Sequence, residues 1–129
     1  PPLEISQRLH AHGDKALEIL DQLNAGDNKE LAKTLNDIRS MAYLGKYYAH
    51  KVAGATHLEL ARKISQGSEQ ARQQSVDELT RASEFWKLYM ETASSAYKNP
   101  LWTNRVGHVN WEQIYGWTLE DIEIARGNK

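Results

Sequence analysis

The stretch LAKTLNDIRSMAYLGKYYAHKV, residues 31–52, decides the fold class of this chain. Its apolar and small residues recur every three or four positions, the spacing that places side chains on one face of an α-helix. This spine comprises Leu31, Leu35, Ile38, Ala42, Gly45, Ala49 and Val52. It predicts a long helix over residues 29–65 with one face in a bundle seam. Gly45 costs about 1 kcal/mol relative to alanine inside a helix, and we expect close contact with a neighbouring helix to offset that cost.

The rest of the chain is equally free of helix breakers. Its three prolines stand at positions 1, 2 and 100, and no stretch alternates with the period of a β-strand. Further helices are predicted over residues 3–24, 69–98 and 111–126. The links between them are short, so neighbouring helices should run antiparallel. We therefore expect an all-α fold, in which residues 1–129 form one antiparallel up-down helical bundle of three long helices plus a shorter C-terminal helix.

Helix boundaries are marked by capping residues. Asn28, Ser68 and Asn110 each precede a predicted helix and are of the types that cap helix N-termini. Residues 99–109 contain a proline and a glycine and are predicted to form a loop without regular structure. A loop of this length is either functional or packed against the domain.

Composition excludes several classes of function. The 129 residues carry 16 Lys and Arg against 17 Asp and Glu, so no basic excess is available to bind a nucleic acid. No apolar run approaches the roughly 18 residues that span a bilayer. Without cysteine there is no disulfide, thiolate nucleophile or zinc–thiolate site. The first residues, PPLEIS, contain neither an initiator methionine nor a signal peptide, which is typical of a segment of a longer protein.

No catalytic signature is present. A P-loop, a nucleophile elbow and an HExxH motif are all missing. His10 and His12 lie two apart, so on a helix they point to nearly opposite sides and should not hold one metal ion. The acidic residues of the last predicted helix are spread around it and read as a solvated face: Glu112, Glu120, Asp121 and Glu123. We expect no catalytic residue, no metal site and no cofactor, and hence no enzymatic activity of this chain alone.

A second stripe follows the same helix at spacings of four, three, four and three. It consists of Tyr43, Tyr47, His50, Gly54 and His57. Such a stripe most often packs against a neighbouring helix, since tyrosine buries its ring and keeps its hydroxyl wet. The alternative is a polar-aromatic groove for a ligand or partner domain. On that alternative, Tyr43, Tyr47 and His50, together with Phe85 of the next helix, are the candidate interface residues.

Residues 99–117, NPLWTNRVGHVNWEQIYGW, hold three of the four tryptophans. The candidate ligand-binding residues here are Trp102, Arg105, His108 and Trp111. They combine flat aromatic faces with hydrogen-bond donors, a composition that suits a sugar. The same composition suits a loop that closes the bundle, with its tryptophans in the core and Arg105 on the carbonyls of a helix end. We favour the closing loop and keep the ligand site as the alternative.

Three segments resemble a known family: LNDIRSMAYLGKYYAHKVAGA (residues 35–55), FWKLYMETASSAYKNPLW (residues 85–102) and GHVNWEQIYGWTLEDIEIAR (residues 107–126). They are similar to the helical C-terminal region of large secreted carbohydrate-active proteins of Bacteroides-type bacteria, which are glycoside-hydrolase-like. In that family the catalytic acids lie in an upstream barrel, so the resemblance assigns no catalytic residue to this chain. It implies a periplasmic or extracellular location and a polysaccharide context.

Our leading hypothesis is therefore a non-catalytic accessory domain of a carbohydrate-processing protein. Such a domain would pack on the catalytic domain of the same polypeptide or shape its cleft, and polysaccharide would be a further partner. One alternative is an autonomous carbohydrate-binding module. The other is a helical protein–protein interaction domain unrelated to sugars.

Overall fold

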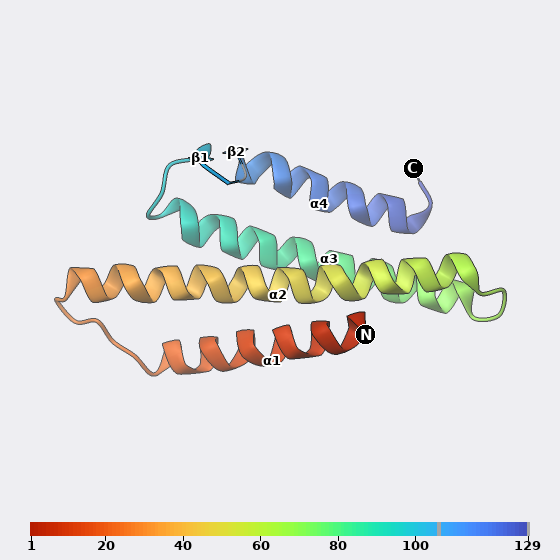
Figure 1. Cartoon of the computed structure of the whole chain (residues 1–129), viewed down its shortest axis with the longest axis horizontal. Coiled ribbons are helices and arrows are strands. Elements are labelled where there is room, and N and C mark those ends of the chain that lie inside the picture. The colour runs from red at the N-terminus through yellow and green to blue at the C-terminus, as the bar shows by residue number, and fades with distance from the viewer. Residues whose placement is uncertain (106, 129) are drawn as a thin grey trace.

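A computed structural model of the chain describes residues 1–105 and 107–128. Within these residues lie four helices and one hairpin: α1 (Pro2–Asp21), α2 (Lys29–Lys63), α3 (Ser68–Ser94), β1 (Leu101–Thr103), β2 (Gly107–Val109) and α4 (Trp111–Arg126). Consecutive helices are antiparallel and lie side by side in chain order, with α2 and α3 in the middle (Figure 1). The structure confirms the all-α bundle of three long helices and a shorter last one. None of the described helices has the length and apolarity needed to cross a membrane.

Two of the three predicted N-caps are confirmed. The side chain of Asn28 accepts a hydrogen bond from the Leu31 amide at 3.0 Å, and Asn110 accepts one from the Gln113 amide at 3.1 Å. The prediction at Ser68 was wrong by one residue, because the cap of α3 is Gly67. Its φ of +79° lies in the left-handed region, which glycine enters without the steric cost that a Cβ brings.

The main core lies among α2, α3 and α4. One cluster of buried residues contains Tyr47, Ala82, Trp86, Ala93 and Trp111, and a second contains Val76, Leu79, Ile122 and Ala125. Helix α1 packs against the outer side of α2 and buries only Ser6, Gly13 and Leu20. This first helix is therefore the least firmly held by apolar burial.

The close approach of two helices occurs at Gly54 and not at Gly45. A Cβ at Gly54 would lie 2.7 Å from Cγ of Leu79, whereas one at Gly45 would meet nothing within 4 Å. The expectation for Gly45 was therefore wrong: it borders a groove between α1 and α2. Leu31 of the predicted spine is also 40% exposed, because the first turns of α2 extend beyond the end of α1 (Figure 1).

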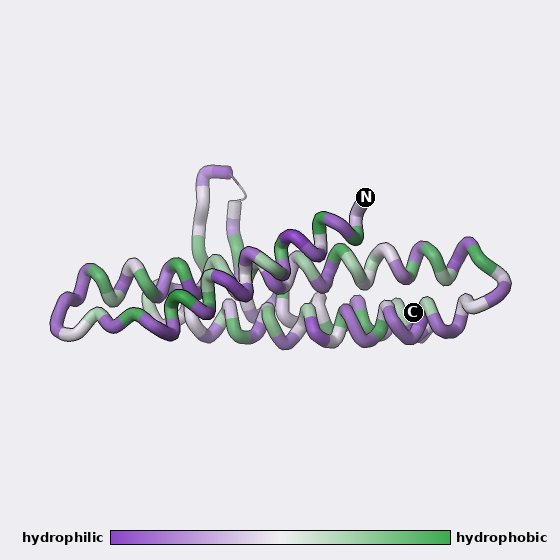
Figure 2. The backbone as a smooth tube through the Cα atoms, turned by 90° about the horizontal axis from the view of Figure 1, so that it is seen from below, coloured by the Kyte–Doolittle hydropathy of each residue, from purple (hydrophilic) through white to green (hydrophobic). Residues whose placement is uncertain are grey.

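Residues 101–103 and 107–109 pair as a β-hairpin, which corrects the prediction of an irregular loop. Strands β1 and β2 are antiparallel and pair Leu101 with Val109, Trp102 with His108 and Thr103 with Gly107. Three-residue strands are too short for a period-two pattern to stand out in the sequence. The base of the hairpin is tied by Asn99, whose side-chain oxygen accepts a hydrogen bond from the Trp111 amide at 2.9 Å. Figure 2 shows the hairpin standing out from the helices.

Candidate functional site

The hairpin brings together three of the four predicted ligand-binding residues. Trp102 is 71% exposed and lies directly opposite His108 across the two strands. Arg105 is exposed in the turn between them. We call Trp102, Arg105 and His108 the hairpin platform. It presents an aromatic ring, a guanidinium and an imidazole outside the core.

The fourth predicted residue, Trp111, belongs to the core and not to this platform. It is 2% exposed, its ring lies 6.1 Å from that of Tyr89, and its carbonyl accepts a hydrogen bond from the Trp86 indole at 3.0 Å. The closing role predicted for the tryptophans of this segment thus holds for Trp111 but not for Trp102. The role expected of Arg105 at a helix end falls to Arg72, which donates to the Ala125 carbonyl of α4 at 3.0 Å.

Three of the four candidate interface residues contact one another between α2 and α3, and the fourth, Tyr47, packs on Trp86 of α3. Tyr47 is buried edge-on against Trp86, with ring centroids 5.0 Å apart. His50 stacks on Phe85 at 5.4 Å, and Tyr43 lies 6.4 Å from the same ring. Burial raises the pKa of Tyr47 to about 12, so its hydroxyl stays neutral at physiological pH. The aromatic residues of the stripe on α2 therefore pack against α3, which is the first of the two interpretations given for the stripe.

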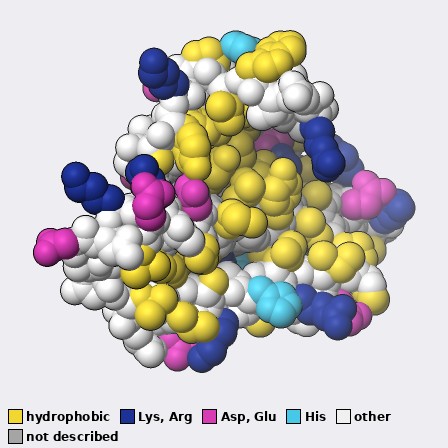
Figure 3. Space-filling view, turned by 60° about the vertical axis from the view of Figure 1, so that its left-hand side comes forward, with side chains coloured by type: hydrophobic (Ala, Val, Ile, Leu, Met, Phe, Trp, Pro, Cys, Tyr) yellow, Lys and Arg dark blue, Asp and Glu magenta, His cyan; other side chains and the backbone are white. Residues whose placement is uncertain are grey.

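An exposed hydrophobic surface adjoins the hairpin. One groove of about 350 Å³ lies between α2, α3 and the hairpin, and another of about 350 Å³ lies between α1 and α2. Met41 lines both grooves and is 72% exposed. We call the two grooves together the apolar face; its principal residues are Leu9, Ala16, Ile38, Met41, Leu44, Tyr89 and Leu101. Figure 3 shows hydrophobic side chains gathered in a hollow at this end of the molecule.

This surface could not be predicted from the sequence because its parts come from different elements. Met41 lies one position before the spine residue Ala42 and reads as an ordinary exposed side chain. Only the packing of α1 and of the hairpin beside α2 makes it the junction of two grooves. The signal available in the sequence was a hydrophobic residue outside the predicted spine. An isolated residue of this kind is common on protein surfaces.

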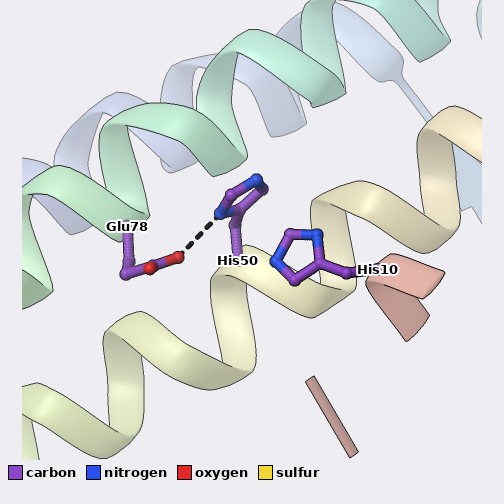
Figure 4. Close-up of side chains that lie close together, drawn as sticks. All are labelled: His10, His50 and Glu78. Carbon is purple, nitrogen blue, oxygen red and sulfur yellow. Dashed lines mark hydrogen bonds and ion pairs between the residues drawn. The ribbon is translucent and has the colours of Figure 1, made fainter. Parts of the chain in front are cut away.

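A polar cluster lies where α1, α2 and α3 meet: His10, His50 and Glu78, one residue from each helix (Figure 4). Nδ1 of His50 lies 2.7 Å from Oε2 of Glu78, and the His10 and His50 rings meet edge to face at 4.3 Å. All three side chains are half-buried. Burial, followed by the charges of His50 and Lys46, lowers the pKa of His10, so its imidazole is neutral at pH 7.

Beside this cluster, Lys46 and Asp14 form an ion pair. The Lys46 side chain is 10% exposed, and its Nζ is 2.6 Å from a carboxylate oxygen of Asp14. The ammonium also lies 5.3 Å from the centre of the Phe85 ring, within the range of a cation–π interaction. Gly13 leaves room for this lysine, since a Cβ there would lie 2.9 Å from its side-chain carbons. The buried cation is thus paired rather than free to repel another positive charge.

In the sequence, the only histidine near His10 is His12. His12 is exposed and borders the groove between α1 and α2, whereas His10 faces the other two helices. The side chains of His10 and His12 therefore point to different sides of α1, as their spacing of two residues predicted. The partners of His10 are 40 and 68 residues away in the chain (50 − 10 and 78 − 10), so no local spacing could have identified them.

Compared with protein-family models, curated proteins and solved structures, the chain has no significant match. The resemblance of residues 35–55, 85–102 and 107–126 to carbohydrate-active proteins therefore stays a hypothesis. The surfaces described above are the basis on which function has to be argued.

Proposed function

We propose that this bundle is a non-catalytic accessory domain of a carbohydrate-processing protein, and that its apolar face docks on the catalytic domain of the same polypeptide. The observation that carries the proposal is the position of Met41, 72% exposed where two apolar grooves join. A contiguous apolar surface of this kind favours contact with another protein surface. The carbohydrate context, and with it a periplasmic or extracellular location, rests on the resemblance of the sequence.

The anatomy of the face also suits a domain interface. Its centre is hydrophobic and includes a methionine, whose flexible side chain adapts to a partner surface. Its margin is polar: Asp37, which lines one of the grooves, accepts a hydrogen bond from the Tyr97 hydroxyl at 3.0 Å. A hydrophobic centre inside a polar rim is the usual arrangement of protein interfaces.

Met41→Glu should separate the two domains without unfolding the bundle. In the full polypeptide we expect the bundle and the catalytic domain to unfold in one calorimetric transition, and the variant to unfold in two. A charge placed in the docked interface has no partner there, whereas in the separated bundle this position is largely solvated. Leu60→Glu is the matched control: it introduces the same charge on α2, roughly 28 Å further along the helix, at a residue 44% exposed.

Two results would contradict the docking proposal. One is a Met41→Glu protein whose transitions coincide with those of the wild type and of Leu60→Glu. The other is a polypeptide in which no catalytic domain accompanies the bundle, which the gene sequence on either side would reveal.

The hairpin platform supports a second candidate function, the binding of polysaccharide by the bundle itself. The supporting observation is the exposed ring of Trp102 next to the imidazole of His108. Flat aromatic faces stack on the apolar faces of sugar rings, while neighbouring donors bind their hydroxyls. Because this platform lies outside the core, it can serve a ligand without any cost to the fold.

Trp102→Ala tests this second function. If the platform binds sugar, some polysaccharides embedded in the gel should slow the wild type in affinity electrophoresis. The variant should migrate through the same gels without being slowed. Its melting temperature should stay within about 2 °C of the wild type, since substitutions at exposed positions usually have small effects on stability. Trp117→Ala, at a tryptophan of α4 that is 53% exposed, is the control and should bind normally. Equal retention of all three proteins across a panel of plant, algal and host polysaccharides would rule the platform out.

A further inference from the structure

We propose that His10, His50 and Glu78 form a Zn²⁺ site that joins α1 to α2 and α3. Two imidazoles and one carboxylate, each from a different helix, bring their candidate ligand atoms within 4.8 Å of one another (Figure 4). This site is distinct from the apolar face and the hairpin platform, and it does not depend on the proposed docking function.

The spacing of the three side chains fits a tetrahedral ion. Their candidate ligand atoms all lie within 4.8 Å of one another. In a tetrahedral zinc site with bonds of about 2.0–2.1 Å, ligand atoms are about 3.4 Å apart. The nitrogen of His50 and the oxygen of Glu78, now 2.7 Å apart, have to separate slightly, and His10 has to approach them. We expect rotations of the His10 and Glu78 side chains to make both movements.

The proton balance of binding is simple. In the metal-free protein, Nδ1 of His50 and Oε2 of Glu78 are joined by a hydrogen bond of 2.7 Å. When Zn²⁺ binds, a lone pair of Nδ1 becomes the ligand, so the ring carries its single proton on Nε2. Within the described part of the chain, neither ring nitrogen of His10 takes part in a hydrogen bond, so this imidazole binds the ion without losing a partner. Water fills the fourth position, as in other sites with three protein ligands.

The surroundings hold the ligands in position. His50 is stacked on the Phe85 ring at 5.4 Å, which fixes the plane of its imidazole. Lys46, a cation whose charge acts on His10, is paired with Asp14 at 2.6 Å, so its charge is largely compensated. Two imidazoles with one carboxylate are a donor set that favours Zn²⁺ over Mg²⁺ and Ca²⁺, which prefer oxygen ligands throughout.

The consequence of binding falls on α1. This helix buries only Ser6, Gly13 and Leu20, so apolar packing holds it weakly. A metal ion shared with α2 and α3 adds a link between α1 and the core helices. The apolar groove between α1 and α2 is lined on its α1 side by residues that include Leu9, next to His10. Zinc binding would hold this side of the groove in place.

Isothermal titration calorimetry of the full 129-residue chain with ZnCl₂, after treatment with EDTA, tests the proposal. We expect one ion per chain, a rise of several degrees in melting temperature, and no response to MgCl₂. The test variant is His10→Gln, because this side chain has no hydrogen bond to lose and the variant should fold. Its affinity should fall at least about 100-fold, since the loss of an outer-shell partner alone costs 10–100-fold in metal sites. CoCl₂ should give the visible absorption of a tetrahedral ion with the wild type and not with the variant.

His12→Gln is the matched control, two residues away on the same helix and exposed. It should bind Zn²⁺ as the wild type does. The proposal is overturned if the wild type shows no saturable binding, if His10→Gln binds as tightly as the wild type, or if His12→Gln loses as much affinity as His10→Gln. The last result would place the ion on exposed histidines of α1 and not between the three helices.

Discussion

Replacing Trp86 by alanine is expected to lower the free energy of unfolding by about 3–5 kcal/mol, a large part of the stability of a domain of this size. Its indole is 5% exposed and lies 5.0 Å from the Tyr47 ring and 5.2 Å from the Tyr89 ring. Alanine would leave a cavity where α2, α3 and α4 meet. It would also remove the N–H group that donates to the Trp111 carbonyl, so this buried hydrogen bond between α3 and α4 would be lost.

Urea denaturation followed by far-UV circular dichroism measures this loss. Trp86→Phe separates the two contributions: it keeps an aromatic ring in the core but lacks the indole N–H, so its loss should be smaller than that of alanine. Trp117→Ala, which removes an indole that is 53% exposed, should change the stability by less than about 1 kcal/mol. If Trp86→Ala were no more destabilising than Trp117→Ala, the core as described would be wrong.

The same substitution at two glycines of α2 should have opposite effects. Gly54→Ala is expected to destabilise the bundle by about 1–2 kcal/mol, although alanine favours a helix by about 1 kcal/mol over glycine. The new Cβ would lie 2.7 Å from Cγ of Leu79, and this leucine is only 4% exposed and cannot swing away. The Gly54 carbonyl also accepts a hydrogen bond from buried Ser75 at 2.8 Å, which holds the two helices at this separation.

Gly45→Ala is the counterpart and should stabilise the bundle by up to about 1 kcal/mol, because nothing lies within 4 Å of the added methyl group. Thermal and urea unfolding of the two variants beside the wild type give the comparison. Equal shifts of the same sign would show that helix propensity alone governs both positions and that the close approach at Gly54 has no energetic weight.

The hairpin shows how far local sequence patterns reach. Residues 101–109 contain no pattern long enough to predict strands, because each strand has only three residues. Their pairing becomes stable when Asn99 and Trp111 join at the base and Trp111 is buried among the helices. The sequence marked Trp102 and Trp111 alike as aromatic residues of one segment. Burial separates them, since one lies on the hairpin surface and the other in the core.

The four helices, their approximate ends and their antiparallel order could all be predicted from the sequence. These depend on local properties: a repeat of three and four residues, a lack of internal proline, capping asparagines and short links. The tertiary structure alone decided which glycine meets a neighbouring helix, that Met41 joins two grooves, and that His10, His50 and Glu78 lie together. Each of these depends on how far one helix is rotated and shifted along another. That rotation follows from the packing of side chains distant in the sequence, which no short stretch of the chain encodes.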